Sequence, residues 1–543
     1  MRLTIAAGLV SGLVGSATAV QYGYNHVPLE PDSEIVSSAF KDVDVELLSP
    51  AFIDEEGRLP AFSEGTKGPS NQETMEDYLQ DLASRNEYMA YALANFTSEE
   101  HRSLPYVRLS TSSSSSRKRA ADGDDERVRV WIQAAVHGNE PAGDEAALAL
   151  LAKFDAEPDW AGTVLDKLDI VVLPRYNPDG VFYFQRTLAS NYDPNRDHIK
   201  LARRQTRDIK ALFNAFNPHV VVDLHEYGSA STFADRYVHA ADGLFSAAKN
   251  LNIDAGIRDL AEGLFAKNMG EAMEKNNLRW EPYVTGSSSD GSEGYVAEFA
   301  EAGTDAKIGR NAMGLAQTVT FLVETRGIGL ADQQFQRRTA SGLTMASSVI
   351  QTASDNASKV YRTIEAGRKA LVESAGEEVI VVTDYSETST RPFSMVDKTN
   401  GSVVFPPVLF ASTTPAIANL TRPRPDAYLI PGAWADLAER LRVSGLEVET
   451  LKDGFEGAVE TLTVASADIA TEYYEGAVRV ALTTEAGGRE VKLPAGSFRV
   501  SARQQRAALA FVALEPENMD SYAAFNIVPL EEGDEYPVYR LKA

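Results

Sequence analysis

A histidine and a glutamate lie three residues apart in the segment from Val130 to Phe154. An apolar run ends at His137, the chain turns through a glycine and an asparagine to Glu140, and an Ala/Leu-rich helical stretch follows. Imidazole nitrogens and carboxylate oxygens are ligands that zinc accepts, and three protein ligands leave a fourth position open for water. One tight turn therefore presents two candidate zinc ligands.

Polar side chains also end three other apolar runs of the chain, at residues 177–180 (NPDG), 223–226 (DLHE) and 324–326 (ETR). The carboxyl ends of the strands in an α/β sheet converge on one crevice, so residues far apart in sequence become neighbours there. A single histidine beside a strand is more often a hydrogen-bonded structural residue than a ligand. Two of the seven histidines at such ends favour a shared metal, and His225 is then its third ligand.

Strand-like and helical stretches alternate around these motifs. The apolar runs are VRVWIQAAV, LDIVVLPRY, HVVVDLH and VTFLVETRG. Such alternation predicts an α/β domain whose mixed, largely parallel sheet is flanked by helices. The tail of the chain is richer in strand-like runs and holds no catalytic constellation, so it predicts a smaller α+β C-terminal domain.

The composition changes along the chain predict five segments. They are a signal peptide over 1–19, an N-terminal extension or propeptide over 20–70, a catalytic domain over 71–331, a helical linker over 332–377, and an α+β C-terminal domain of unknown role over 378–543. A polar run, STSSSSSRKRAADGDDE, precedes the first catalytic strand and is expected to be a loop, because it cannot bury a face.

The overall charge and the N-terminus restrict the class of protein. A formal charge of −26 disfavours nucleic acid and anionic membrane surfaces as partners. One early arginine, a short apolar stretch and Ala17-Thr18-Ala19 predict a cleaved secretion signal. No later apolar run has the roughly eighteen residues that a membrane-spanning helix needs. We therefore expect a secreted, extracellular protein.

The cysteine count and the glycosylation triplets bear on the same prediction. The chain has no cysteine, so a disulfide framework is excluded and core burial or metal must hold the fold. Four Asn-x-Ser/Thr triplets permit glycosylation of an exported chain, at Asn95, Asn356, Asn400 and Asn419.

Five motifs occur in a fixed order along the chain: HGNE, NPDG, DPNRD, VDLHE and FLVETRG. This series resembles the zinc metallocarboxypeptidases of the carboxypeptidase A type, over roughly residues 70–330. Carboxypeptidase A is itself a standard example of ligation by two histidines and a glutamate. The resemblance implies one Zn²⁺ per chain, held by His137, Glu140 and His225, and a peptide or protein substrate with a free C-terminus.

The resemblance also implies roles for other residues. Glu324 matches the catalytic glutamate, which takes a proton from metal-activated water and passes it to the leaving amine. Arg186 matches the arginine that stabilises the oxyanion and contacts the substrate. Asn195 and Arg196 match the pair that binds the terminal carboxylate of the substrate. Asp193 matches a carboxylate that orients a ligand histidine, and a turn or helix-cap role is the alternative for it.

Some positions depart from the digestive members of that family. Asn139 stands where those members have an arginine, and Glu226 follows the third ligand where they have a smaller residue. Tyr295 is the tyrosine that we predict to close over the substrate, although it is farther from Glu324 than the family pattern expects. Arg310 is an alternative candidate to face the pocket.

The sequence thus predicts a secreted zinc-dependent carboxypeptidase that hydrolyses the C-terminal peptide bond by metal-activated water. Two alternatives stay open: a zinc-dependent N-acyl amino acid hydrolase on the same fold, and a catalytically silent peptide-binding module. The preferred terminal residue, a propeptide role for residues 20–70, the role of the C-terminal domain and the oligomeric state are left open.

Overall fold

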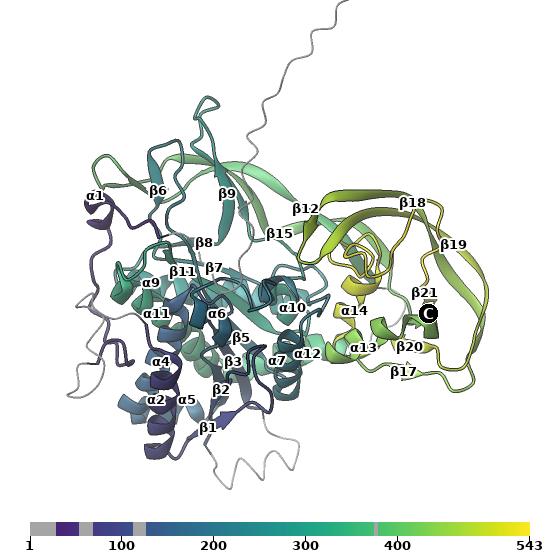
Figure 1. The fold of residues 1–543 in the computed structure, drawn as a ribbon, viewed down its shortest axis with the longest axis horizontal. Helices are drawn as coiled ribbons and strands as arrows, with labels where there is room; N and C mark the ends of the chain where they lie inside the picture. The colour runs from purple at the N-terminus through teal and green to yellow at the C-terminus, as the bar shows by residue number, and fades with distance from the viewer. Residues whose placement is uncertain (1–28, 54–68, 112–125, 374–377, 543) are drawn as a thin grey trace, which may run out of the picture.

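The computed structural model describes residues 29–53, 69–111, 126–373 and 378–542 (Figure 1). The predicted signal peptide over 1–19 and most of the Ser/Arg-rich insert lie outside these residues. In the described part, no helix combines the length and the apolar character needed to cross a bilayer.

An eight-stranded mixed sheet forms the centre of the larger lobe. Its four middle strands are parallel to one another. At one edge β2 is antiparallel both to β1 and to β4, and at the other side β7 is antiparallel to β11. In spatial order the strands are β1 (Met89–Leu93), β2 (Pro105–Leu109), β4 (Leu168–Leu173), β3 (Val128–Ala134), β5 (Val220–Gly228), β11 (Val319–Ile328), β7 (Gly243–Ala247) and β8 (Trp280–Pro282).

Both faces of this sheet are buried, which explains why its middle strands are almost entirely apolar. Alternate side chains point to opposite faces: Ile132 and Val222 belong to one apolar cluster, and Trp131 and Val221 to another. The helices are α2 (Gln72–Arg85), α4 (Pro141–Ala156), α5 (Pro158–Leu165), α6 (Pro178–Tyr183), α7 (Arg204–Phe216), α8 (Ala255–Leu260), α9 (Lys267–Lys275), α10 (Gly309–Gly314), α11 (Phe335–Asp355) and α12 (Ala357–Glu373).

Helix α11 belongs to the packed unit, although the sequence suggested a linker over 332–377. It contacts α4, α9 and β11, and most of its residues are buried. A Cβ added at Gly342 would lie 2.9 Å from the Ala146 methyl group, so the two helices approach closely there. This part of the predicted linker therefore completes the layer over the sheet.

The described N-terminal residues pack onto the same unit. They include the short helix α1 (Glu34–Ser37). Asp32 forms a two-pronged ion pair with Arg326, at 2.6 and 2.9 Å, and the Ala51 amide donates to Glu145. Residues 29–53 thus form part of the folded surface.

Long strands connect the two lobes of the molecule. β12 (Val379–Pro392) pairs with β15 (Pro407–Pro423), and β15 pairs in turn with β10 (Ala297–Glu301), which pairs with β9 (Val284–Ser288). A second small sheet joins β6 (Tyr237–His239), β13 (Met395–Asp397) and β14 (Val403–Val404). The first part of the predicted C-terminal domain therefore shares sheets with the catalytic half.

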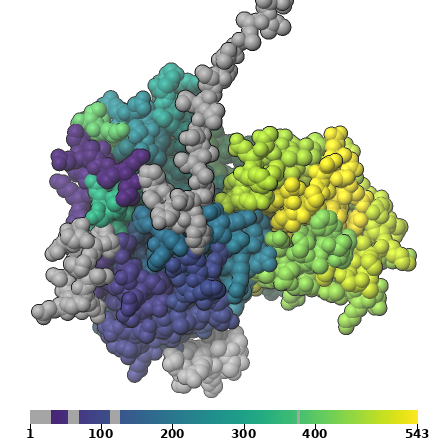
Figure 2. All heavy atoms as spheres, viewed as in Figure 1, coloured from purple at the N-terminus to yellow at the C-terminus, as the bar shows by residue number. Residues whose placement is uncertain are grey.

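The remaining residues form a lobe of their own, coloured yellow-green in Figures 1 and 2. It contains helices α13 (Ala435–Val443) and α14 (Ala507–Leu514). Its six-stranded sheet has the order β17 (Glu449–Thr450), β20 (Phe498–Ser501), β16 (Ala427–Ile430), β21 (Tyr539–Leu541), β18 (Phe455–Tyr474) and β19 (Ala477–Leu493).

Candidate active site

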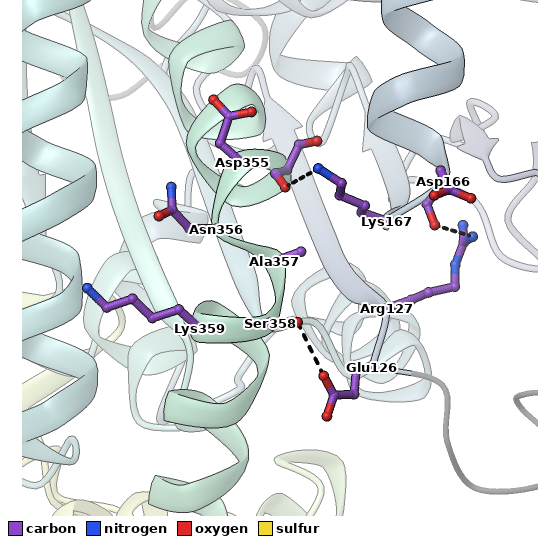
Figure 3. A pocket seen from close by; sticks show the side chains of 10 residues that line it. Glu126, Arg127, Asp166, Lys167, Asp355, Asn356, Ala357, Ser358 and Lys359 are labelled. Atoms are coloured by element: carbon purple, nitrogen blue, oxygen red, sulfur yellow. Dashed lines mark hydrogen bonds between the residues drawn. The ribbon is translucent and has the colours of Figure 1, made fainter.

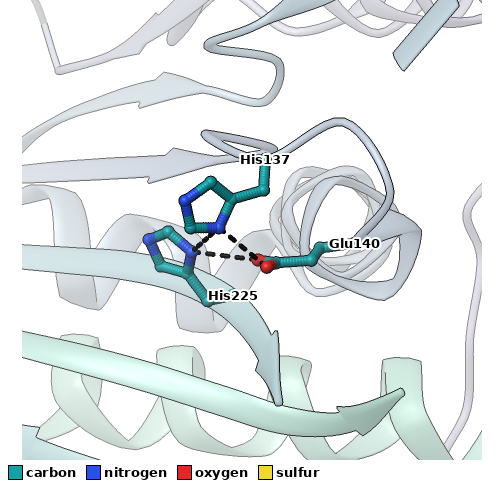
Figure 4. A group of neighbouring side chains, drawn as sticks. All are labelled: His137, Glu140 and His225. Atoms are coloured by element: carbon teal, nitrogen blue, oxygen red, sulfur yellow. Dashed lines mark hydrogen bonds and ion pairs between the residues drawn. The ribbon is translucent and has the colours of Figure 1, made fainter. Parts of the chain in front are cut away.

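Three buried side chains converge at the carboxyl ends of β3 and β5 (Figure 4). His137 Nδ1 lies 2.7 Å from Glu140 Oε1, and His225 Nδ1 lies 2.9 Å from Glu140 Oε2. The two Nδ1 atoms are 3.2 Å apart. Two imidazole nitrogens and a carboxylate that face one another in this way match the donor set of a zinc site.

The strand ends bring these residues together. The chain leaves β3 through Ala135, which has a left-handed φ of +49°, and turns so that Glu140 directly precedes α4. A non-glycine residue in this region costs of order 1–3 kcal/mol and occurs most often at functional sites. In the parallel pair β5 and β11, Glu324 lies directly opposite His225.

The glycines of the HGNE and NPDG motifs, Gly138 and Gly180, lie against each other. A Cβ added at Gly138 would lie 1.8 Å from the carbonyl carbon of Gly180, so the HGNE turn and the NPDG turn meet backbone to backbone. Asn177 holds the second turn, because its Oδ1 accepts the Gly180 amide and its Nδ2 donates to the Thr187 carbonyl. The NPDG motif thus supports the turn that carries His137 and Glu140.

Each histidine of the cluster has a carboxylate behind it. Asp193 Oδ1 lies 3.2 Å from His137 Nε2, and Asp223 Oδ1 lies 3.2 Å from His225 Nε2. A carboxylate that accepts the Nε2 hydrogen, as Asp193 can from His137, leaves the Nδ1 lone pair free for a metal. Asp223 is within ion-pair distance of His225 Nε2 without an aligned hydrogen bond. Asp193 also accepts the Asn195 amide at 2.8 Å, so it holds the turn as well as the histidine. Asp223 is part of the DLHE motif, but the sequence assigned it no role.

The charges of the cluster follow from these contacts. Although burial opposes ionisation, His137 and His225 hold the pKa of Glu140 well below its ordinary value. Burial also opposes the charged form of His225, yet Asp223 and Glu140 raise the pKa of this imidazole well above its usual range. The site therefore strongly favours a positive charge between Glu140 and the two rings.

Glu324 is buried beside the cluster and lines a cavity of about 580 Å³. Its Oε2 has no hydrogen-bond partner among the described residues. Burial raises the pKa of Glu324 to about 8, and the charge of Glu140 acts in the same direction. A carboxylate with a raised pKa beside a metal site is suited to accept and release a proton.

Three predicted substrate contacts, Arg186, Asn195 and Arg196, line the same cavity. Arg186 lies between Asp193 (2.9 Å) and Glu140 (3.4 Å). Asn195 Oδ1 accepts the Gly309 amide at 2.7 Å. Arg196 Nη1 donates to the Asn195 carbonyl at 2.9 Å, and no ion pair of Arg196 occurs among the described residues.

Tyr295 is not among the residues that line the cavity. Its hydroxyl instead donates to Glu293 and Glu298, at the exposed end of the loop between β9 and β10. Tyr283, by contrast, lines the same cavity as Glu324. In the structure Tyr283, and not Tyr295, lines the cavity, and a role of Tyr295 in closing over a substrate stays a prediction.

Arg310, the alternative candidate, does line the cavity and is 1% exposed. Glu226 and Asn139, the two positions that differ from the digestive enzymes, are both buried near the candidate metal ligands. Glu226 pairs with Arg338 at 2.9 Å, and its amide donates to Glu140 Oε2 at 3.1 Å. Asn139 is buried, and its Oδ1 has no partner among the described residues.

The C-terminal lobe reaches the cavity through the tip of its longest hairpin. Strands β18 and β19 are joined at Glu475 and Gly476, which both have positive φ, +50° and +78°. Glu475 Oε2 accepts the Asp193 amide at 2.9 Å, and Tyr474 lines the cavity. A sequence separation of nearly three hundred residues hides this contact from any local pattern.

A second cavity, of about 600 Å³, lies between the start of β3 and the junction of α11 with α12 (Figure 3). Arg127 and Lys167 point along its wall, and both donate to backbone carbonyls, those of Asp166 and Ser354. The one hydroxyl–carboxylate contact among its lining residues is the bond from Ser358 Oγ to Glu126 Oε2, which is long, at 3.4 Å, and exposed. No group of histidine and carboxylate ligands like that of His137, Glu140 and His225 occurs among them. We therefore assign the chemistry to the cavity beside Glu324.

Comparisons with known proteins identify the family of the chain. A model of the zinc carboxypeptidase family, Peptidase_M14, matches residues 75–241. Carboxypeptidase 2 of Trichophyton equinum is 52% identical over 540 residues, which cover 98% of each chain. Carboxypeptidase 2 of Trichophyton rubrum is 52% identical over 541 residues, which cover 99% of this chain and 98% of the relative. A solved metallo-carboxypeptidase from Burkholderia cenocepacia has a TM-score of 0.39 and 15% identity, covering 52% of this chain and 70% of that chain.

The identity to these relatives over nearly the whole length shows that the chain belongs to the zinc carboxypeptidase family. The chain is accordingly a peptidase, and the predicted resemblance and fold class are confirmed. The family is zinc-dependent, and the cluster of His137, Glu140 and His225 has the ligands that such a metal requires.

Proposed function

We propose that the protein is a secreted carboxypeptidase that removes the C-terminal residue of peptides with one zinc ion per chain. The observation that carries this proposal is the convergence of His137, Glu140 and His225 with Glu324 directly opposite His225. A zinc ion bound by these three residues supplies Lewis acidity and lowers the pKa of a water to about 7.

The other residues of the cavity handle protons and charge. Glu324 takes the proton of the attacking water through its unpaired oxygen and passes it to the leaving amine. Arg186 donates to the oxyanion that develops on the scissile carbonyl, and losing one such donor costs on the order of 10²–10³ in rate. The contact of Arg186 with Asp193 holds its guanidinium beside the cluster.

The terminal carboxylate of the peptide binds to Asn195 and Arg196. The guanidinium of Arg196 donates to the backbone carbonyl of Asn195 and retains donors for a carboxylate. Asn195 is fixed by its bond to the Gly309 amide. Because the pair requires a free C-terminus, it makes the enzyme an exopeptidase.

Export rests on the sequence. The N-terminal signal pattern lies outside the described residues, and the absence of cysteine is compatible with an exported chain held by its core. Three of the four glycosylation triplets have an exposed asparagine in the structure: Asn95, Asn400 and Asn419.

The test is a digest of a mixed peptide pool, followed by mass spectrometry with and without a chelator. We expect successive loss of C-terminal residues that the chelator stops and added zinc restores. N-acyl amino acids serve as the competing substrates. Cleavage inside peptides, loss from the N-terminus, or faster turnover of N-acyl amino acids than of peptides would contradict the proposal.

A further inference from the structure

Arg310 in α10 is a buried guanidinium without a matching anion. It is 1% exposed, and it lines the same cavity as Arg196 and Glu324. Its Nη2 donates to the Gly303 carbonyl at 2.5 Å. Its Nε and Nη1 have no hydrogen-bond partner in the described part of the chain.

The other cations around the cavity differ from Arg310. Arg186 is paired with Asp193, and Lys307 is paired with Asp305 at 3.3 Å and with Asp520 at 3.4 Å. Removing a charged group from water costs several kcal/mol unless a partner compensates it. Among the described residues, neither Arg196 nor Arg310 forms an ion pair, although Asp305 and Glu324 act on Arg310 from a longer distance and Asp193 interacts with Arg196. Both guanidinium groups therefore keep donors for a carboxylate in one cavity.

Arg310 lies next to the proposed site of the terminal carboxylate. The amide of its neighbour Gly309 donates to Asn195 Oδ1, and Tyr283, Arg310 and Glu324 line the same cavity. A ligand with one carboxylate at Asn195 and Arg196 thus has a second cation within the same cavity. A residue with two carboxylates matches that pair of charges.

On the basis of the proposed function, we propose that Arg310 is a specificity-determining residue that binds the side-chain carboxylate of a C-terminal glutamate or aspartate. A guanidinium binds a carboxylate through two parallel hydrogen bonds, and Nε and Nη1 are the two donors that lack partners here. A cavity of about 580 Å³ has room for such a residue. The enzyme then prefers acidic C-termini over neutral ones of the same shape.

The first test compares blocked dipeptides that differ only in the last residue: glutamate, glutamine or leucine. We expect the wild-type enzyme to cleave the glutamate peptide with a kcat/KM about 10²-fold or more above that for glutamine, since a site built for a polar group strongly rejects analogues that lack it. Arg310→Met, which keeps the length of the side chain, should abolish this preference, and Arg310→Lys should restore part of it. Equal cleavage of the glutamate and glutamine peptides by wild type would overturn the proposal.

An equal fall for all three peptides in Arg310→Met, with normal folding, would also overturn it, because Arg310 would then bind the terminal carboxylate shared by all. A second readout separates this proposal from the proposed function. In the zinc-loaded Glu324→Gln protein, calorimetry should show tighter binding of N-benzoyl-glutamate than of N-benzoyl-glutamine. If no peptide is cleaved by wild type, the proposed function fails, and this binding difference still decides the role of Arg310: equal affinities reject it.

Discussion

At the scale of single residues, the site depends on pairs that hold each other in position. His137 and His225 are each backed by an aspartate, and only Asp193 could be recognised from a motif. Asp223 lies two residues before His225 on β5, so both side chains point to the same face of the strand. The motif VDLHE contains Asp223, but no sequence pattern shows whether an aspartate in a buried strand binds the metal itself or orients a histidine that does.

Replacing Asp223 should weaken metal binding. Asp223→Asn removes the charge that orients His225, and loss of such a partner typically costs 10–100-fold in metal affinity. Competition between the protein and a chromogenic chelator measures this affinity directly. An affinity equal to that of wild type would show that Asp223 has no part in the zinc site.

Glycine at position 138 should be indispensable to the site. In Gly138→Ala the new methyl group would lie 1.8 Å from the Gly180 carbonyl carbon, so one of the two turns must shift and displace His137 or Glu140. We expect loss of most bound zinc and activity, together with a lower Tm. The matched control is Gly162→Ala in α5, where no atom lies within 4 Å of the new Cβ; it should retain zinc and gain up to about 1 kcal/mol in stability. Normal zinc content in Gly138→Ala would refute this account.

At the scale of elements, the hairpin of β18 and β19 places part of one lobe at the site of the other. A Cβ added at Gly476 would lie 2.2 Å from the Tyr192 hydroxyl, at a φ of +78°. On the same tip, Glu475 accepts the Asp193 amide and Tyr474 lines the cavity. The tip therefore positions one wall of the substrate site.

Disturbing this tip should affect substrate binding more than zinc binding. Gly476→Ala should raise KM roughly tenfold, because strain and collision of 1–3 kcal/mol displace the wall, while zinc content stays normal. Gly496→Ala is the control, since Gly496 has a similar φ of +90° and nothing within 4 Å of a new Cβ. Steady-state kinetics of both variants would test this, and identical KM values would contradict it.

The sequence predicted the elements that local patterns encode. The four middle strands form at the predicted apolar runs, because buried parallel strands are continuous apolar runs, but β5 and β11 continue through their polar motifs to Gly228 and Ile328. The sequence patterns did not predict contacts between distant segments, because such patterns report only local structure. Tyr283 and Tyr474 reach the cavity through strand pairing that neither composition nor periodicity encodes, and α11 is a packed helix whose amphipathic pattern also suited a linker.

At the scale of the whole molecule, buried neutral histidines make the fold sensitive to acid. Burial lowers the pKa of His239 to about 3 and that of His219 to about 4. The unfolded chain binds these protons near pH 6.5, so their contribution to stability is complete above that pH and is lost as the pH falls toward 3. For His239 the loss at pH 5 is about 2 kcal/mol.

The substitution His239→Phe should therefore reduce the loss of stability in acid. The ring stacks on Phe299 at 5.3 Å and contacts Phe233 at 5.0 Å, so a phenyl group suits the position. Thermal unfolding at pH 7 and pH 5 gives the comparison. The difference in Tm between the two pH values should shrink in the variant, and an unchanged difference would argue against a neutral His239.

Glycan mapping tests the exported state at the same scale. Asn95, Asn400 and Asn419 are exposed, whereas Asn356 is half-buried and its Nδ2 donates to the Thr352 carbonyl at 3.0 Å. In protein secreted by a glycosylating host, we expect glycans on the exposed asparagines and little on Asn356. A glycan found on Asn356 and on none of the other three asparagines would contradict the exposure that the structure gives them.

The zinc content of the purified full-length protein tests the central claim most directly. Elemental analysis should find one zinc per chain in wild type, one in Glu324→Gln, and almost none in His225→Ala, because His225 binds the metal and Glu324 lies beside it. A wild-type protein without zinc after purification in zinc-containing buffer, or a His225→Ala variant that retains a full equivalent, would contradict the account.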